Sequence, residues 1–201
     1  MEEFDDVSLR VLSAARDVFV QAGIQRSTMD DVAKAAGVSR ITVYRRFSTK
    51  DILVDAVVRW EFRQYFTQFL EDIKAAHTVA DRVVVGFVSS LRRMRGNSLI
   101  GGLLTAEPGS LVPSMVGRQG QTFANVREFV ADQLRSEQKA GNVASDLDVV
   151  LVADMLVRVS TSFLVAPSDI VDLDDDERIA ALARQFLVPM LNPPGSVRMT
   201  P

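Results

Sequence analysis

The stretch TMDDVAKAAGVSRITVYRRFSTKDI, residues 28–52, decides the fold of the N-terminal part of the chain. Thr28 and Asp31 have the spacing of a capping box, which marks the start of a helix, and Gly37 ends that helix after about two turns. Ser39 can cap a second short helix, in which Val43 and Phe47 lie four residues apart and share one face. Two short helices joined by a glycine turn predict a helix-turn-helix motif.

The second of these helices carries the chemistry. In a helix-turn-helix motif it lies in the DNA major groove, and its first residues reach the base edges. With Val38, Val43 and Phe47 facing the bundle, the residues that project outward are Arg40, Ile41, Thr42, Tyr44, Arg45 and Arg46. Arginine can fork onto guanine, and apolar groups can read the thymine methyl group. The alternative is that these arginines form an ordinary solvated helix face.

Three positions around this helix favour contacts with phosphate. A tyrosine such as Tyr44 can bond a phosphate, and Lys50 and Thr28 lie at predicted helix N-termini, where the backbone already favours anions. Residues 26–50 carry six basic and two acidic side chains, while the whole chain has a net charge of −3. A basic patch on an acidic body directs nucleic-acid binding to one end of the molecule.

The composition excludes several other classes of protein. The 201 residues include no cysteine and one histidine, so they offer little material for a metal site, a redox site or a nucleophile, and no enzyme motif is present. We therefore expect no enzyme, no cofactor and no metal. The acidic start MEEFDD is unlike a signal peptide, and Asp154 and Arg158 interrupt the longest apolar stretch. A cytoplasmic protein without a membrane partner is the expectation.

The remaining periodicity is helical throughout, which predicts an all-α fold. An apolar stripe is formed by Val11, Leu12, Ala15, Val18 and Phe19, and Gly23 gives the stop signal after it. A long helix is expected over 50–76. Further helices are expected over 79–95, 99–107, 113–140, 147–165 and 175–191, followed by a flexible tail at 192–201. The predicted architecture is an N-terminal three-helix bundle, residues 1–50, joined by the long helix to a larger C-terminal helical bundle, residues 51–201.

Residues 8–60 resemble the N-terminal domain of TetR/AcrR-type bacterial transcription regulators. The matching pieces are AARDVFVQAG, STMDDVAKAAGVS and TVYRRFSTKDIL. The resemblance implies phosphate contacts by Thr28, Tyr44 and Lys50, and places three residues near the bases: Arg40, Ile41 and Thr42. Family members often carry a small residue in place of Ile41 and a histidine or tyrosine in place of Arg46. The operator sequence therefore cannot be copied from a relative.

Beyond residue 60 the resemblance covers only the number and length of the helices. It implies that the C-terminal bundle binds a small molecule and that the last two long helices form a homodimer. Both of those helices are apolar over wide faces, so they could pair with each other inside one subunit or with their copies in a four-helix dimer interface. Candidate pocket residues are Phe66, Phe69, Phe87, Leu91, Met94, Leu103, Met115, Phe123 and Phe163, with Arg92, Asn97, Glu107, Gln119 and Arg127 as polar groups. For each aromatic residue, plain core packing is the alternative.

The sequence thus predicts a sequence-specific transcription regulator that binds double-stranded operator DNA through Ser39 and the outward residues named above. A repressor released by a small apolar or amphipathic ligand is the leading hypothesis. The alternatives are a ligand-independent regulator or an activator with the same fold, or a helical adaptor or enzyme that does not bind DNA.

Overall fold

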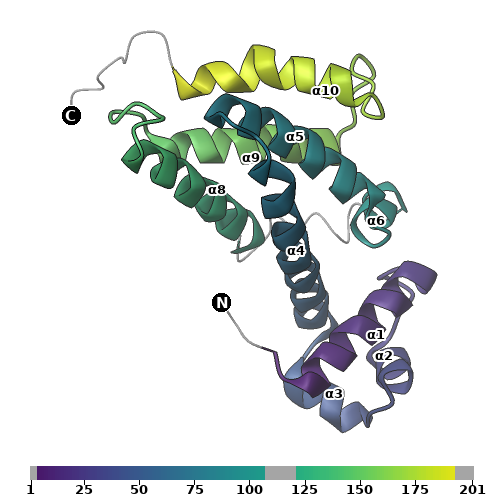
Figure 1. Ribbon diagram of the computed structural model, residues 1–201. Helices are drawn as coiled ribbons and strands as arrows, with labels where there is room; N and C mark the ends of the chain where they lie inside the picture. Colours follow the sequence, from purple (N-terminus) through teal and green to yellow (C-terminus); the bar gives the residue numbers. More distant parts are fainter. Residues whose placement is uncertain (1–3, 107–120, 193–201) are drawn as a thin grey trace, which may run out of the picture. The chain divides into compact units, whose positions relative to one another are not determined.

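The structure, a computed structural model, describes residues 4–106 and 121–192, and every regular element within those ranges is helical (Figure 1). The all-α prediction is therefore confirmed. The helices are α1 (Asp6–Ala22), α2 (Met29–Ala36), α3 (Arg40–Arg46), α4 (Lys50–Lys74), α5 (Val79–Gly96), α6 (Ile100–Ala106), α8 (Gln121–Lys139), α9 (Val149–Val165) and α10 (Asp176–Leu182). None of the helices in this part of the chain is both long and apolar enough to cross a membrane.

The last helix is less regular than the sequence predicts. After α10 the backbone widens into a π-helical turn, Ala183–Leu187, and then tightens into a 3₁₀ turn, Val188–Leu191. Pro189 has no backbone N–H, so a regular α-helix could not continue through it with all of its hydrogen bonds. The start of the predicted helix 113–140, including residues 113–120, and the tail 193–201 lie outside the described residues.

The chain packs as two compact units. Residues 1–67 and 94–123 form the first unit, and residues 68–93 and 124–201 form the second. The long helix α4 and the helix α5 each contribute residues to both units. This division follows packing rather than function, so the functional domains 1–50 and 51–201 stay a prediction.

In the first unit, α2 packs against both α1 and α3, and Figure 1 shows the start of α4 close to these helices. Their apolar stripes supply the core, in which Leu12, Val32 and Val43 are fully buried. Thr28 and Asp31 form the expected capping box at the start of α2. Gly37 ends α2 with φ 64° and ψ 35°, a left-handed conformation that glycine adopts at the lowest cost. These terminal signals hold α3 at a defined angle to α2.

The second unit buries an apolar cluster among α8, α9 and the final 3₁₀ turn. The cluster includes Ala131 and Leu134 of α8, Val152 and Ala153 of α9, and Leu191. Its packing places the start of α9 against the end of the chain's last helix. Ion pairs add to this core, among them Arg82 with Glu137 between α5 and α8.

Candidate nucleic-acid interface

Helix α3 is anchored by one face and exposed on the other. Ser39 caps its start by accepting a hydrogen bond from the Thr42 backbone N–H at 3.1 Å, and Val43 and Phe47 are buried in the core. The outward side chains are then left in solvent: Ile41 is 78% exposed and Tyr44 is 39% exposed. An apolar side chain as exposed as Ile41, beside arginines, suits contact with a base edge better than contact with water alone.

The two hydroxyl groups at the start of α3 are already engaged. The Ser39 and Thr42 hydroxyl oxygens lie 2.8 Å apart in a hydrogen bond, in addition to the capping bond. Thr42 is half-buried as a result. Their predicted contacts with DNA stay predictions, and the structure adds a capping role for Ser39.

The three arginines of α3 differ sharply in their surroundings. Arg45 is exposed and, within the described residues, makes no ion pair. Arg40 is 64% exposed at its side chain and contacts Asp30 of α2. Arg46 is only 20% exposed, because its guanidinium turns back onto α1. The sequence predicts that all three project outward. In the structure Arg40 and Arg46 pair with acids of the same subunit, so of the three Arg45 is the one whose charge is available to DNA.

Arg46 braces α3 against the start of α1. Its Nη2 donates to Asp5 Oδ2 at 2.7 Å, and its Nε donates to the Ser8 hydroxyl at 3.2 Å. Asp5 is itself the N-cap of α1, where it accepts from the Ser8 backbone N–H at 2.7 Å. The hydrogen bond from Arg46 lowers the pKa of the Asp5 carboxyl well below its ordinary value, and the Ser8 bonds lower it further. The structure thus gives Arg46 a positioning role that the outward placement predicted from the sequence did not include.

This difference can be tested with a matched pair of variants. Arg46→Ala is expected to lower the melting temperature by about 2–4 °C, because it breaks the brace. Arg45→Ala is expected to leave melting unchanged and to reduce the salt slope of DNA binding by about one. The lowered pKa of Asp5 means that the brace stabilises at neutral pH and weakens as the pH falls below about 4. The melting difference between wild type and Arg46→Ala should therefore shrink in acid; a difference that persists there would contradict the brace.

Lys50 and Thr28 also have partners within the subunit. The Lys50 ammonium donates to the Ser27 carbonyl at 2.6 Å and to the Gln25 carbonyl at 3.1 Å. A hydrogen bond from the Thr28 side chain lowers the pKa of Asp31, and the Thr28 backbone N–H lowers it further. Since an ammonium group has three donors, Lys50 keeps one for a phosphate while it ties the turn before α2 to α4. Phosphate contacts by both residues stay predictions.

The residues that sequence reasoning missed are acidic. Asp5, Asp30 and Glu61 each hold an arginine of the first unit in place. The spacing of apolar and polar residues along the sequence does not reveal ion pairs between residues that are far apart in the chain. Only the capping position of Asp5, three residues before Ser8, was visible in the sequence.

Asn97, a candidate polar group of the pocket, belongs to the Glu61 network. Its Nδ2 donates to Glu61 Oε2 at 2.6 Å, while its Oδ1 accepts from the backbone N–H groups of Leu99 and Ile100. Both ends of this amide are therefore engaged within the first unit.

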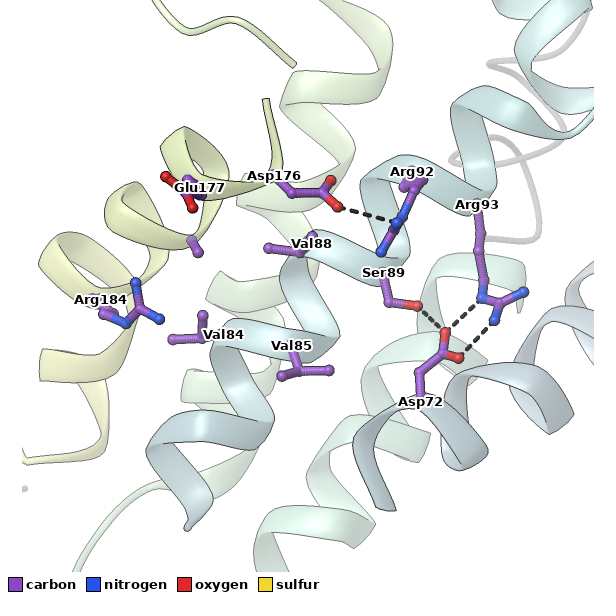
Figure 2. A pocket seen from close by; sticks show the side chains of 11 residues that line it. Asp72, Val84, Val85, Val88, Ser89, Arg92, Arg93, Asp176, Glu177 and Arg184 are labelled. Carbon is purple, nitrogen blue, oxygen red and sulfur yellow. Dashed lines mark hydrogen bonds and ion pairs between the residues drawn. The ribbon is translucent and has the colours of Figure 1, made fainter. Parts of the chain in front are cut away.

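The second unit has an open groove between α5 and α10, with a volume of about 1000 Å³ (Figure 2). Val84, Val85 and Val88 of α5 supply its apolar wall. Its charged groups are Asp72, Arg92, Arg93, Asp176, Glu177 and Arg184. The groove is more charged than the usual small-molecule site, which is mostly apolar with a few polar groups, so its lining suits an amphipathic molecule.

One end of the groove is held by Asp72 near the end of α4. Arg93 grips both of its carboxylate oxygens at 2.6 Å, and the Ser89 hydroxyl also donates to it (Figure 2). The Arg93 hydrogen bonds lower the pKa of Asp72, so it carries its charge at neutral pH. Next to Arg93, Arg92 pairs with Asp176 of α10 at 3.1 Å (Figure 2).

Of the pocket residues expected from the sequence, Arg92 lines this groove, whereas the apolar candidates that the structure describes do not. Phe87 and Leu91 are buried, and Phe87 packs edge-to-face against Phe163 with ring centroids 6.0 Å apart. Phe69 makes a similar contact with Phe129 at 5.9 Å. Met94 is buried, whereas Phe66 and Phe123 are half-buried. Met115, Glu107, Gln119 and the side chain of Leu103 lie outside what the structure describes, so the predicted pocket stays a prediction.

Comparison with known proteins points in one direction. Residues 11–57 match the family described as "Bacterial regulatory proteins, tetR family". The HTH-type transcriptional regulator UidR of Escherichia coli is 25% identical over 175 residues, which cover 87% of this chain and 86% of UidR.

Solved structures share the fold across nearly the whole chain. The TetR family repressor AlkX from Dietzia sp. superimposes with a TM-score of 0.70 and 22% identity, covering 95% of this chain and 97% of AlkX. The regulator FadR from Bacillus subtilis, solved in complex with stearoyl-CoA, gives a TM-score of 0.60 and 18% identity. The match covers 93% of this chain and 99% of FadR.

Proposed function

Because this chain is a DNA-binding transcription regulator of the tetR family and not an enzyme, we propose that it acts as a homodimeric repressor that releases its operator when a small molecule binds. One observation carries the DNA-reading part of this proposal. The outward face of α3 keeps Arg40, Ile41, Tyr44 and Arg45 in solvent, while buried residues on its other face anchor the helix. These four side chains are the proposed readers of base edges and phosphates.

Selection from random-sequence duplexes tests this function directly. The wild-type protein is expected to enrich a near-palindrome whose half-sites are one duplex turn apart, about 34–36 Å. Arg40→Ala should relax the preference at one position in each half-site and cost about 1–3 kcal/mol of discrimination. Recovery of no common sequence by the wild-type protein would refute sequence-specific binding.

The proposed dimer rests on an exposed apolar face of the last two helices. Leu151 and Phe186 are each 58% exposed in the subunit, and Met155 lies one turn from Leu151 on α9. Buried residues of the same two segments, among them Val152, Ala153 and Leu191, pack into one core cluster. A second copy of the chain would cover the exposed side chains, and two-fold symmetry would present two α3 helices to a palindrome.

The proposed effector is an apolar or amphipathic molecule bound in the second unit. The α5–α10 groove supports this, since its valines suit an acyl chain and Arg184 has no ion-pair partner within the described residues, so it can meet an acidic head group. A ligand there would lie beside the Asp72–Arg93 pair, and Asp72 belongs to α4, the helix that begins directly after the DNA-reading motif. It would release DNA only if it favoured one conformation over another.

The acyl-CoA bound by FadR suggests which ligands to try first. Saturated fatty acids and their coenzyme A thioesters are expected to lower operator affinity in the same binding assay. Val88→Trp, which fills the groove, should abolish that response while leaving operator binding intact.

A further inference from the structure

Arg40, the first residue of α3, is held by a carboxylate from the neighbouring helix. Its Nη1 donates to Asp30 Oδ2 at 3.1 Å, and its Nε lies 3.0 Å from Asp30 Oδ1. Its guanidinium carbon also lies 5.3 Å from the centroid of the Tyr44 ring, in a cation–π contact. The guanidinium thus has an acid on one edge and an aromatic ring against it. Together these contacts restrict a side chain that otherwise has many rotamers.

The pair gives little stability by itself. Arg40 is 64% exposed and Asp30 is 56% exposed, and an ion pair in solvent contributes almost nothing to folding. Asp30 also opposes DNA binding in general, because it adds a negative charge next to the proposed reading surface. Asp30 lies in the first turn of α2, where the helix dipole favours an acid, but that role does not require the contact with Arg40.

The geometry leaves the reading edge of Arg40 available. A guanidinium has five N–H donors, and Asp30 accepts a hydrogen bond from one of them, on Nη1, while its other carboxylate oxygen lies close to Nε. The two hydrogens of Nη2 and the second hydrogen of Nη1 are not used within the described residues. Those two nitrogens form the fork that pairs with the O6 and N7 atoms of guanine. Asp30 occupies one edge of the guanidinium and orients the other.

We propose that Asp30 is a specificity-determining residue: it positions the Arg40 fork for a single guanine without touching DNA itself. This inference rests on the proposed function and extends it to a residue outside the recognition helix. An oriented guanidinium discriminates between bases more sharply than a mobile one, because only the correct base meets both N–H groups at once. A mobile Arg40 would instead reach any nearby phosphate, which raises affinity for all sequences.

The test compares wild type, Asp30→Asn, Arg40→Ala and the double variant on two duplexes. The duplexes are the sequence selected by the wild-type protein and a shuffled duplex of the same composition. Asp30→Asn is expected to lower the ratio of the two affinities about tenfold, with a slightly higher affinity for the shuffled duplex. Asp51→Asn, which removes an exposed acid of the same unit that has no ion-pair partner in the described residues, is the charge-matched control and should leave the ratio unchanged.

The selected base profile identifies the mechanism. Asp30→Asn should relax the same position that Arg40→Ala relaxes, and it should have no further effect on the ratio in the Arg40→Ala background. An unchanged ratio in Asp30→Asn and in a second variant, Asp30→Ser, would overturn the proposal, and so would a full effect in the absence of Arg40. Failure of the wild-type protein to select any sequence would refute the proposed function instead. Circular dichroism melts confirm that each variant is folded.

Discussion

A variant that carries Leu151→Glu and Phe186→Glu is expected to be monomeric and to lose at least a hundredfold in operator affinity. Both side chains are more than half exposed in the subunit, so the substitutions leave the subunit core intact. In the proposed dimer the same positions are buried, and charges placed there would meet their symmetry copies. Each monomer would then bind one half-site alone and lose the gain from linking two binding events, which is 10²–10⁴-fold in typical cases, so about a hundredfold is the lower end.

Light scattering measures the first effect and operator titration the second. The wild-type protein should show about twice the subunit mass of 22.1 kDa, and the double variant a single subunit mass. Leu70→Glu is the matched control, since Leu70 is also an exposed leucine of the second unit but lies on α4. A dimer that survives the double substitution would place the interface elsewhere.

Replacing Glu61 is expected to destabilise the first unit strongly. Glu61 is 7% exposed, and its carboxylate accepts from Arg16 Nε at 2.8 Å and from Asn97 Nδ2 at 2.6 Å. Arg16 lies on α1, and the Oδ1 of Asn97 accepts from the first N–H groups of the α6 turn. One buried carboxylate therefore joins α1, α4 and the start of α6. Glu61→Ala should lower the free energy of unfolding by about 3 kcal/mol, because Arg16 and Asn97 would lose the carboxylate that accepts their hydrogen bonds.

Urea denaturation of Glu61→Ala and Glu71→Ala separates this network from a general effect on α4. Glu71 is an exposed acid on the same helix, and Lys74 is its one ion-pair partner within the described part of the chain. Its removal should lower the free energy of unfolding by less than about 0.5 kcal/mol. The double variant Glu61→Met with Arg16→Met should lose less free energy of unfolding than Glu61→Met alone, because it leaves no unpaired Arg16 charge. Equal costs for the Glu61 and Glu71 variants would show that the network contributes nothing.

The local elements of the fold could be predicted from the sequence because their signals are local. The capping box at Thr28, the left-handed turn at Gly37 and the burial of Val43 each depend on neighbours within a few residues, and all three are present. The irregular end of the last helix was missed, although Pro189 marked it. A proline inside an apolar helical pattern predicts a break but does not specify the π turn before it.

The candidate site was predictable in part for the same reason. Periodicity placed Arg40 and Tyr44 on the outward face of α3, and they are there. Periodicity also placed Arg46 outward. The pattern of residues along α3 contains no information on Asp5, which binds Arg46 but is 41 residues away in the chain. The α5–α10 groove was missed since it depends on how two distant helices approach, and valines on α5 look the same in a core as in a groove.

The π turn at the end of the last helix has a consequence for self-recognition. One extra residue in a helical turn rotates every later side chain by about 100° relative to a regular α-helix. Phe186 lies within that turn, so its side chain points in a different direction from the one that a regular α-helix would give it. A paralogue with an unbroken final helix would present its apolar side chains in a different phase and would fit this surface poorly. In the proposed homodimer, the widened turn would favour pairing between identical chains over pairing with a chain whose final helix is unbroken.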